Sequence, residues 1–549
     1  MFTTAIRFRI GFPWPAAPAT LFMLALGACS GGGGSSAVTP TTPVTPPSPA
    51  GPVSSASTFT ASCAGVPNPG TLYANAEVEP HLAINPADPN NLIGSWQQDR
   101  WSNGASQGIA VGFSFDAGAT WSTRALPASR CGGGNAANGG DYERASDPWT
   151  AISANGTAYQ MSLAVSGATL EPGSQSAMLV FRSTDGGRTW GNATALIRDG
   201  DQFFNDKNTI TADPTDSRYV YAAWDRLTQD NRGPAFFART VDGGLTWEPA
   251  RAIHDPGAGN QTLGNVIAVL PDGTLINFFN QLNTVANALV GSFRVMRSTD
   301  KGATWSAPIK VADYFGVGTH DPETGAAIRD AGYLGQISVG PQGQLYTVWQ
   351  DARFSNGERD AIALSRSTDG GLTWSTPVRV NADAGVQALI GSVNARADGI
   401  IGVSYFDMRA NTSNPATLLV DHWLATSRDA GAWTDRRITA AAFDLAMAPV
   451  ARGYFLGDYM GLASNGTTFY PFYVRTNNDL ANRTDVFITP TVVTAGSAEA
   501  SVNLRLAGDI ASFTPSEEHR RRVHANIVRG MEQRVPGWAR TRGWRTDAP

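Results

Sequence analysis

The sequence predicts an all-β fold, a β-propeller followed by a short C-terminal helix. A short motif, Ser/Thr-x-Asp-x-Gly-x-Thr-Trp, returns along the chain, and self-similarity of this kind indicates a repeat architecture. An apolar segment, a turn and a second apolar segment precede each copy, as expected for antiparallel strands. The composition agrees, because 59 Gly and 33 Pro with only 16% charged residues favour turn-rich β structure.

Turn chemistry explains the residues of the repeated motif. In the first copy Asp116 can accept backbone N–H bonds within its own turn, and Gly118 supplies a conformation that other residues resist. Trp121 packs its large apolar face between neighbouring sheets. Because every copy carries the aspartate, we expect it to have a structural role. The six aspartates, the last in a copy that is one residue short, are Asp116, Asp185, Asp242, Asp300, Asp369 and Asp429.

The first strand of the repeat occurs seven times, once more than the motif. Its copies lie near His81, Trp149, Asn208, Val266, Gln336, Leu389 and Tyr459. We therefore favour seven blades over residues 57–495, with six as the alternative. The last blade lacks a fourth strand, and we expect the N-terminal segment 57–75 to supply it. Closing the ring in this way removes exposed sheet edges.

The N-terminus predicts export. Arg7 and Arg9 precede a short apolar run, as in a signal peptide, which we place over residues 1–28. The run ends in Leu26-Gly27-Ala28-Cys29, which resembles a bacterial lipobox, so Cys29 is the expected lipidation site. The alternative is an ordinary signal peptide with a chance cysteine. Residues 29–56 form a Gly/Ser/Thr/Pro-rich tether. We expect an outer-membrane or cell-surface lipoprotein that meets the membrane through its anchor only.

Two cysteines remain after Cys29. In an exported chain Cys63 and Cys131 are expected to form a disulfide, and two free thiols are the alternative.

Residues 496–549 form a C-terminal extension that contains the helix. Thr514 offers an N-cap, Pro515 the first helical position and Glu517 a capping-box acid, and the helix continues to about Arg534. We favour a solvated, partly frayed tail over a docked helix. The net charge of -5 argues against nucleic-acid binding. The sequence shows no metal-ligand spacing and no phosphate-binding loop, so we expect no metal and no cofactor. We also expect a monomer.

Topology predicts which face of the propeller carries function. In a four-stranded meander the repeated motif occupies the turn between strands three and four, so functional residues should lie at the opposite face. The ends of the second strands offer four arginines. They either form salt bridges between blades, which is the interpretation we favour, or line a bowl-shaped site for an anionic ligand. These are Arg100, Arg226, Arg353 and Arg409. The starts of the first strands add Glu79, Arg144, Asp147, Asp206, Lys207, Asp458 and Tyr459.

The motif and three short stretches resemble the bacterial sialidase-like superfamily of Asp-box, or BNR-repeat, proteins across about residues 75–495. The stretches are Glu79-Pro80-His81, Arg144-Ala145-Ser146-Asp147-Pro148-Trp149 and Gly457-Asp458-Tyr459. The resemblance implies an exo-α-sialidase-like glycoside hydrolase, in which arginines hold the sugar carboxylate, a Glu-activated Tyr is the nucleophile and an Asp is the general acid/base. The family's Phe/Tyr-Arg-Ile-Pro motif is missing, since its only similar string, Phe8-Arg9-Ile10-Gly11, lies in the predicted signal peptide.

We therefore expect a surface carbohydrate-active enzyme that hydrolyses terminal residues of acidic glycans. Asp147 would protonate the leaving oxygen, Tyr459 would attack or stabilise the anomeric centre, and Glu79 would assist. The alternative function is a non-catalytic propeller that binds a glycan or protein. If Asp147 and Tyr459 have structural instead of catalytic roles, Asp147 caps a turn before Pro148 and Tyr459 packs in the interior.

Overall fold

The computed structural model describes residues 51–67, 69–494, 505–506 and 513–540. The chain divides into Met1–Pro43 and Val44–Pro549, and the fold below is that of the second unit. The predicted signal peptide, Cys29 and most of the tether lie outside the described residues.

Antiparallel meanders build the β structure, and the first two share one nine-stranded sheet. The first contains β2 (Val78–Ile84), β3 (Leu92–Trp101), β4 (Ser106–Ser114) and β5 (Ser122–Leu126). The second contains β6 (Arg144–Ile152), β7 (Ala158–Ser166), β8 (Gln175–Ser183) and β9 (Thr194–Asp199). A bridge between Ser106 and Ala145 joins them, and β1 (Leu72–Tyr73) adds to β3.

Five further sheets follow along the chain. The third and fourth meanders contain β10 (Phe203–Ala212), β11 (Val220–Thr228), β12 (Ala235–Thr240) and β13 (Arg251–His254), then β14 (Gln261–Val269), β15 (Leu275–Val285), β16 (Ala288–Ser298) and β17 (Ile309–Tyr314). The fifth and sixth contain β18 (Gln336–Val339), β19 (Leu345–Asp351), β20 (Ala361–Ser367) and β21 (Val378–Arg379), then β22 (Ala388–Ala395), β23 (Ile401–Asp407), β24 (Leu419–Ser427) and β25 (Ala432–Arg437). The last contains β27 (Gly461–Asn465), β28 (Thr468–Thr476), β29 (Thr484–Ile488) and β30 (Thr491–Val492). Short additions are β26 (Phe443–Asp444) on β24, β31 (Arg505–Leu506) on β25, and the 3-10 turns Arg353–Ser355 and Leu445–Met447.

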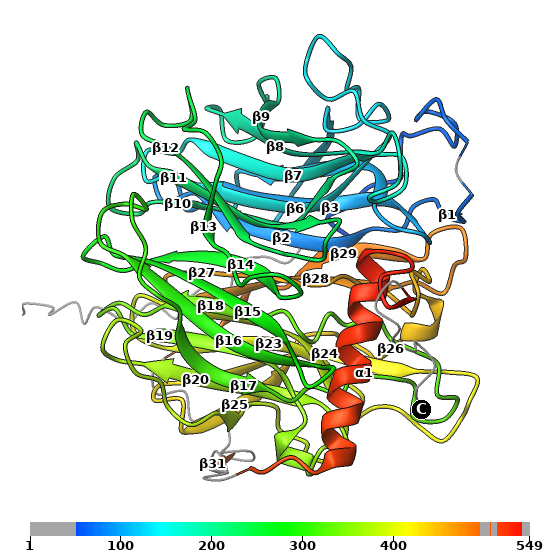
Figure 1. Ribbon diagram of the computed structural model, residues 1–549, viewed down its shortest axis with the longest axis vertical. Coiled ribbons are helices and arrows are strands. Elements are labelled where there is room, and N and C mark those ends of the chain that lie inside the picture. The colour runs from blue at the N-terminus through cyan, green and yellow to red at the C-terminus, as the bar shows by residue number, and fades with distance from the viewer. Residues whose placement is uncertain (1–50, 68, 495–504, 507–512, 541–549) are drawn as a thin grey trace, which may run out of the picture. The chain divides into compact units, whose positions relative to one another are not determined.

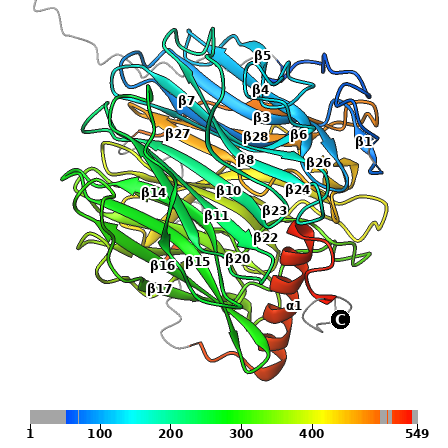
Figure 2. The same cartoon turned by 45° about the horizontal axis from the view of Figure 1, so that its top comes forward.

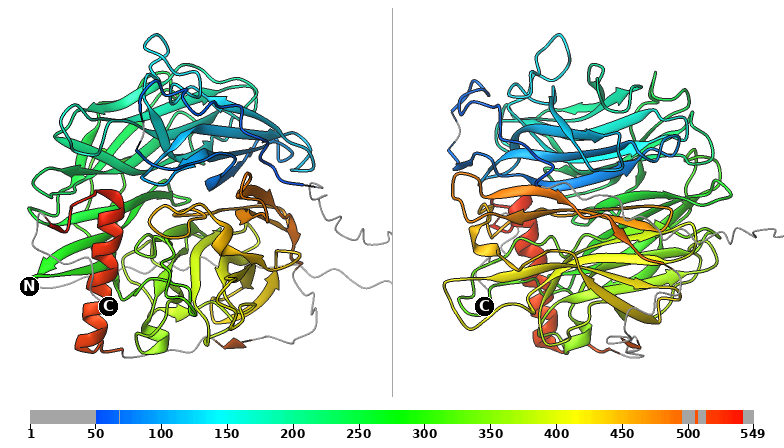
Figure 3. Two further views of the ribbon diagram at one scale, coloured as in Figure 1. Left: turned by 90° about the vertical axis from the view of Figure 1, so that its right-hand side faces the viewer. Right: turned by 180° about the vertical axis from the view of Figure 1, so that it is seen from behind.

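The first strands of the meanders pack against one another in chain order, as in a β-propeller. β2 contacts β6, β6 contacts β10, and the series continues through β14, β18 and β22 to β27. β27 in turn contacts β2, so the strands that are last along the chain lie beside the first ones (Figure 1). Turning the molecule shows the same neighbourhood of the N-terminal and C-terminal strands (Figures 2 and 3). This arrangement has one meander for each of the seven predicted first strands.

The junction of the last and first meanders differs from the prediction that segment 57–75 supplies the outer strand of the last blade. Within that segment β1 pairs with β3 instead, which uses its backbone groups in the first meander. The residues just before and just after this segment contact β29. The Val53 N–H donates to the Val486 carbonyl at 2.7 Å, and Ala76 forms a parallel bridge with Thr484.

The repeated motif forms a closed hydrogen-bonded turn between the third and fourth strands. In the first copy the Thr120 backbone N–H and hydroxyl donate to the Asp116 carboxylate at 2.9 and 2.6 Å. Gly118, at a left-handed φ of 91°, donates its N–H to Ser114 Oγ, and the Trp121 indole donates to the Gly118 carbonyl. The short sixth copy replaces the threonine bonds with backbone bonds from Gly431 and Ala432 to Asp429.

Helix α1 (Glu517–Arg534) is docked, so the prediction of a frayed tail is wrong. Its N-cap is Ser516 rather than Thr514, because the Ser516 hydroxyl accepts the His519 N–H. The side chains at helical spacing from His519 to Arg534 are buried, as in an amphipathic helix packed on a sheet. In the described part of the chain no helix has the length and hydropathy of a membrane span.

The structure contains the predicted disulfide between Cys63 and Cys131, with the two Cα atoms 4.9 Å apart. It attaches the N-terminal segment to the loop that follows β5. Arg130, beside Cys131, strengthens the attachment by donating to the Ala64 carbonyl at 3.0 Å.

Replacing both Cys63 and Cys131 by Ser should lower the free energy of unfolding by about 2–4 kcal/mol, because the crosslink restricts the unfolded chain. Urea unfolding of the oxidised protein and of the double variant measures this difference. Two free thiols in the oxidised, exported protein would contradict the assignment.

Candidate functional site

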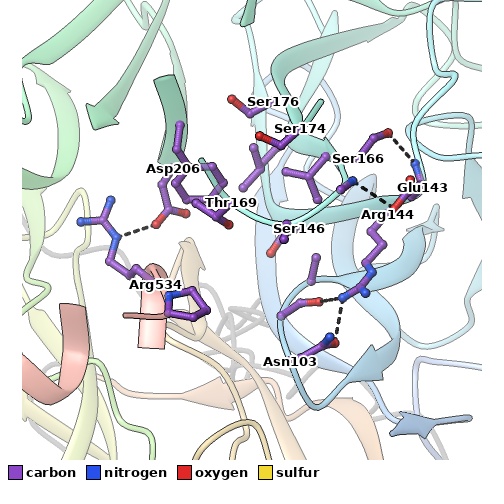
Figure 4. Close-up of a pocket in the computed structure, with 18 of the residues that line it drawn as sticks. Asn103, Glu143, Arg144, Ser146, Ser166, Thr169, Ser174, Ser176, Asp206 and Arg534 are labelled. Carbon is purple, nitrogen blue, oxygen red and sulfur yellow. Dashed lines mark hydrogen bonds and ion pairs between the residues drawn. The ribbon is translucent and has the colours of Figure 1, made fainter. Parts of the chain in front are cut away.

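A cavity of about 380 Å³ opens at the face of the propeller that is opposite the repeated turns. Its walls are the starts of β6 and β10, the β3–β4 and β7–β8 loops and the C-terminal end of α1 (Figure 4). Since these loops connect second to third strands, the cavity lies on the face that topology predicts. None of the six motif aspartates lines it.

Three neighbouring first strands place charged side chains at the same structural position. Glu79, Asp147 and Lys207 adopt left-handed φ angles of 54°, 51° and 51°, each where a bulge shifts the register of β2, β6 or β10. Non-glycine residues in this conformation are strained, and such strain is concentrated at functional sites. Because the bulge recurs in adjacent meanders, the three side chains meet.

Lys207 is the centre of a buried ionic cluster. Its Nζ lies 2.5 Å from Asp458 Oδ2, 3.4 Å from Asp147 Oδ2 and 3.9 Å from Glu79 Oε1. Asp458 also accepts two bonds from Arg329, at 2.8 and 3.1 Å. The Lys207 backbone N–H donates to Asp147 at 3.1 Å, so the bulge itself holds this carboxylate.

Two of the three carboxyls beside Lys207, those of Glu79 and Asp147, have opposite pKa shifts. Burial, together with the charges of Asp147 and Asp458, raises the pKa of Glu79 well above its usual range. Burial is also the largest influence on Asp147 and acts to raise its pKa, but Lys207 and the hydrogen bonds from Ser146 and Glu79 together lower it. Burial therefore favours the protonated form of Glu79, whereas Asp147 favours its ionised form. This charge state differs from the prediction that Asp147 protonates a leaving oxygen.

Three arginines that line the cavity have no carboxylate partner among the described residues. Arg144 donates to Asn103 Oδ1 and the Gly104 carbonyl, and Arg452 donates to backbone carbonyls of α1. Arg100 donates to Gln97, and its buried Nε has no hydrogen-bond partner. Burial lowers the pKa of Arg144 and of Arg100 to about 10, which still leaves both charged at neutral pH.

Several predicted site residues lie behind the cavity wall. Glu79, Asp458 and Tyr459 do not line the cavity, whereas Asp147, Asp206 and Lys207 do. The Tyr459 hydroxyl donates to the Pro148 carbonyl at 2.8 Å, and burial raises its pKa well above the usual range. Tyr459 therefore packs behind Asp147 as a neutral phenol.

The remaining predicted arginines form ion pairs, but only Arg226 forms the predicted salt bridge between blades. Arg226 pairs with Asp199 of the neighbouring meander at 2.7 Å. The other two form ion pairs within their own turns, Arg353 with Asp351 at 2.8 Å and Arg409 with Asp407 at 2.6 Å. None of the three lines the cavity, so of the four arginines that the sequence offers for an anion-binding bowl only Arg100 is in the cavity wall.

Sequence reasoning missed Arg329, Arg452 and Arg534, which also line the cavity. Arg329 and Arg452 lie in irregular segments before β18 and β27, where no strand pattern places them. Arg534 pairs with Asp206 at 2.6 Å and with Asp225 at 3.2 Å, from a helix that the sequence assigns to a tail. No group of three or more His, Cys, Asp or Glu in the described ranges is arranged to hold a metal ion.

No family model matches the chain. It is 27% identical to a xyloglucanase of Paenibacillus sp. over 207 residues, 35% of this chain and 18% of the xyloglucanase, so the match spans under a fifth of that enzyme. Similar solved structures include a Hadza microbial sialidase (TM-score 0.40, 18% identity, 61% of this chain and 64% of that one). Another is an α-L-arabinofuranosidase of Fusarium graminearum (TM-score 0.41, 12% identity, 60% of this chain and 88% of that one). A third is a sialidase of Trypanosoma rangeli (TM-score 0.38, 14% identity, 75% of this chain and 54% of that one).

Replacing Lys207 by Met should destabilise the protein by about 3–5 kcal/mol, because Asp147 and Asp458 lose a shared cation in a buried site. Chemical denaturation measures the change. Lys310→Met is the matched control, since the Lys310–Asp313 pair is exposed and should contribute less than about 1 kcal/mol. Equal effects of the two substitutions would show that the cluster adds nothing special to stability.

The raised pKa of Glu79 predicts a pH dependence of stability. The folded protein holds this proton above the usual pKa of 4.5, so the contribution of Glu79 to stability falls as pH rises. Glu79→Gln should remove this loss, and the variant should gain stability relative to the parent as the pH rises above about 5. Urea unfolding across that range tests it, with exposed Glu358→Gln as control. A constant difference between variant and parent would refute the charge state.

Proposed function

We propose that the protein is a glycoside hydrolase that acts on an acidic sugar residue bound in the cavity. The observation that carries the proposal is the joint presence of unpaired arginines and a carboxyl pair with opposite pKa shifts at one site. Within this proposal the exo-α-sialidase-like specificity expected from the sequence is the finer hypothesis. Display at the outer membrane or cell surface through Cys29 is part of the same proposal.

The arginines support an anionic substrate. Arg100, Arg144 and Arg452 come from three separate segments, and among the described residues none of them forms an ion pair with a carboxylate. A planar guanidinium matches a carboxylate with two parallel hydrogen bonds, which favours a sugar acid over a neutral sugar.

The rest of the cavity wall suits the hydroxyl-rich and apolar surfaces of a sugar. Several hydroxyl side chains lie around Arg144 and Asp206 (Figure 4), and two aromatic residues at the start of β10 also line the cavity. The hydroxyl residues are Ser146, Ser166, Thr169, Ser174 and Ser176, and the aromatic ones are Phe203 and Phe204. Sites of this mixed kind combine apolar contact with a few polar groups that fix orientation.

The carboxyl pair supports hydrolysis. Glycoside hydrolases commonly use two carboxyl groups in different protonation states, and opposite pKa shifts identify the acid and the base. Asp147 faces the cavity as the ionised member and would stabilise positive charge that develops at the anomeric carbon. Glu79 stands behind it as the protonated member. Its proton would reach the leaving oxygen by passing through Asp147, which leaves Glu79 ionised. The xyloglucanase that resembles part of this chain agrees with an action on glycans.

A non-catalytic glycan-binding propeller is the second candidate, and one observation favours it. Asp147 and Asp206 are already paired with Lys207 and Arg534, and Tyr459 does not reach the cavity. Under this candidate the arginines bind an acidic glycan that is released unchanged.

Asp147→Asn separates the two candidates. For a hydrolase, loss of the ionised carboxylate should lower kcat by about 10²–10⁴-fold while binding of acidic sugars persists. The measurement is turnover of a panel of sialosides and uronic-acid glycans by the purified protein. Asp369→Asn, in a repeated turn away from the cavity, is the control and should lower thermal stability with little change in kcat. Binding without turnover in the unaltered protein would favour the second candidate.

A further inference from the structure

We infer that helix α1 is part of the ligand site, so that anion binding depends on a segment outside the propeller. The inference rests on the proposed function, because it concerns the same cavity. Gln533, Arg534 and Pro536, at the end of α1 and just beyond it, line the cavity together with Asp206 and Lys207 of β10. Arg534 and Asp206 point toward one another in this wall (Figure 4).

The body of α1 is held on the propeller by specific contacts at a distance from the cavity. Gly530 lies so close to the Tyr333 ring that an added Cβ would come within 2.1 Å of it. The Asn526 amide donates to the Tyr314 hydroxyl at 3.0 Å, and Arg522 donates to two backbone carbonyls of the β19–β20 loop. Val523 and Ile527 are buried between these contacts. This docking sets the position of the last turn.

Arg452 connects the helix to the anion site. Its guanidinium donates to the Glu532 and Gln533 carbonyls, and the Gln533 side chain donates back to the Arg452 carbonyl at 3.2 Å. The last carbonyls of a helix lack intrahelical partners and carry partial negative charge, which a cation satisfies. The helix end therefore orients Arg452 without neutralising its full charge, and the remaining donors can bind a ligand carboxylate.

Arg534 has a different part in the same wall. Asp206 and Asp225 both accept bonds from it, so it is a positioning residue and not a free anion receptor. Without Arg534, Asp206 would be an unpaired carboxylate in the cavity and would repel an acidic ligand. Docking of α1 thus favours binding of an anionic ligand in two ways: it orients the cation Arg452, and it neutralises the anion Asp206.

The test compares variants of the full chain that release the helix without changing the cavity residues. Ile527→Asp places a charge at a buried position, about 10 Å along the helix from Arg534. Arg521→Ala, at an exposed position of the same helix, is the matched control. Affinity for free sialic acid and for glucuronic acid is measured by calorimetry, and backbone amide exchange over residues 517–536 shows whether the helix is docked.

We expect the Ile527→Asp variant to exchange faster over α1 and to bind the acid probe at least tenfold more weakly, while Arg521→Ala behaves as the parent. In the parent, the bound probe should slow exchange over residues 530–536. Gly530→Ala, whose added Cβ would clash with the Tyr333 ring outside the cavity, should reproduce both effects and serves if Ile527→Asp does not fold. Unchanged affinity in a variant whose helix is released would overturn this inference and leave the acidic-sugar proposal standing. A parent that binds neither probe would overturn both it and the acidic-sugar proposal.

Discussion

The buried amine of Lys207 is the interaction on which the candidate site depends. Placing one ammonium and three carboxyls out of water is costly unless each charge has a partner and good geometry. Here Lys207 contacts Glu79, Asp147 and Asp458, and Arg329 completes the pairing of Asp458. The cation helps to keep Asp147 ionised, whereas burial and the charges of Asp147 and Asp458 favour the protonated form of Glu79.

Repetition separates structural from functional residues in this fold. The motif aspartates recur in six of the meanders and accept hydrogen bonds within their own turns, so their role is to stabilise those turns. The bulge at the start of the first strands also recurs, but its residue changes from Glu79 to Asp147 to Lys207. A repeated backbone conformation with a changing side chain brings unlike charges to one point, and this is how a symmetric scaffold makes an asymmetric site.

Arginines at the cavity divide into two groups by their partners. Arg329 and Arg534 are neutralised by aspartates and hold the walls together. Arg100, Arg144 and Arg452 bond mainly to amide and carbonyl oxygens and keep their charge for a ligand. The difference matters because a guanidinium already paired with a carboxylate offers little net attraction to an acidic sugar.

The sequence by itself determined the propeller, the motif turns, the disulfide and the face that carries the cavity, because turn residues and strand periods are local properties. It also placed Arg144 and Asp147 at the cavity wall, since both lie at the start of a recognisable strand. Only the tertiary structure decided that Tyr459 is enclosed, that Arg452 and Arg534 join the site, and that Asp147 is ionised. These outcomes depend on burial and on charges contributed by distant segments, and no local pattern of residues encodes which charges will meet.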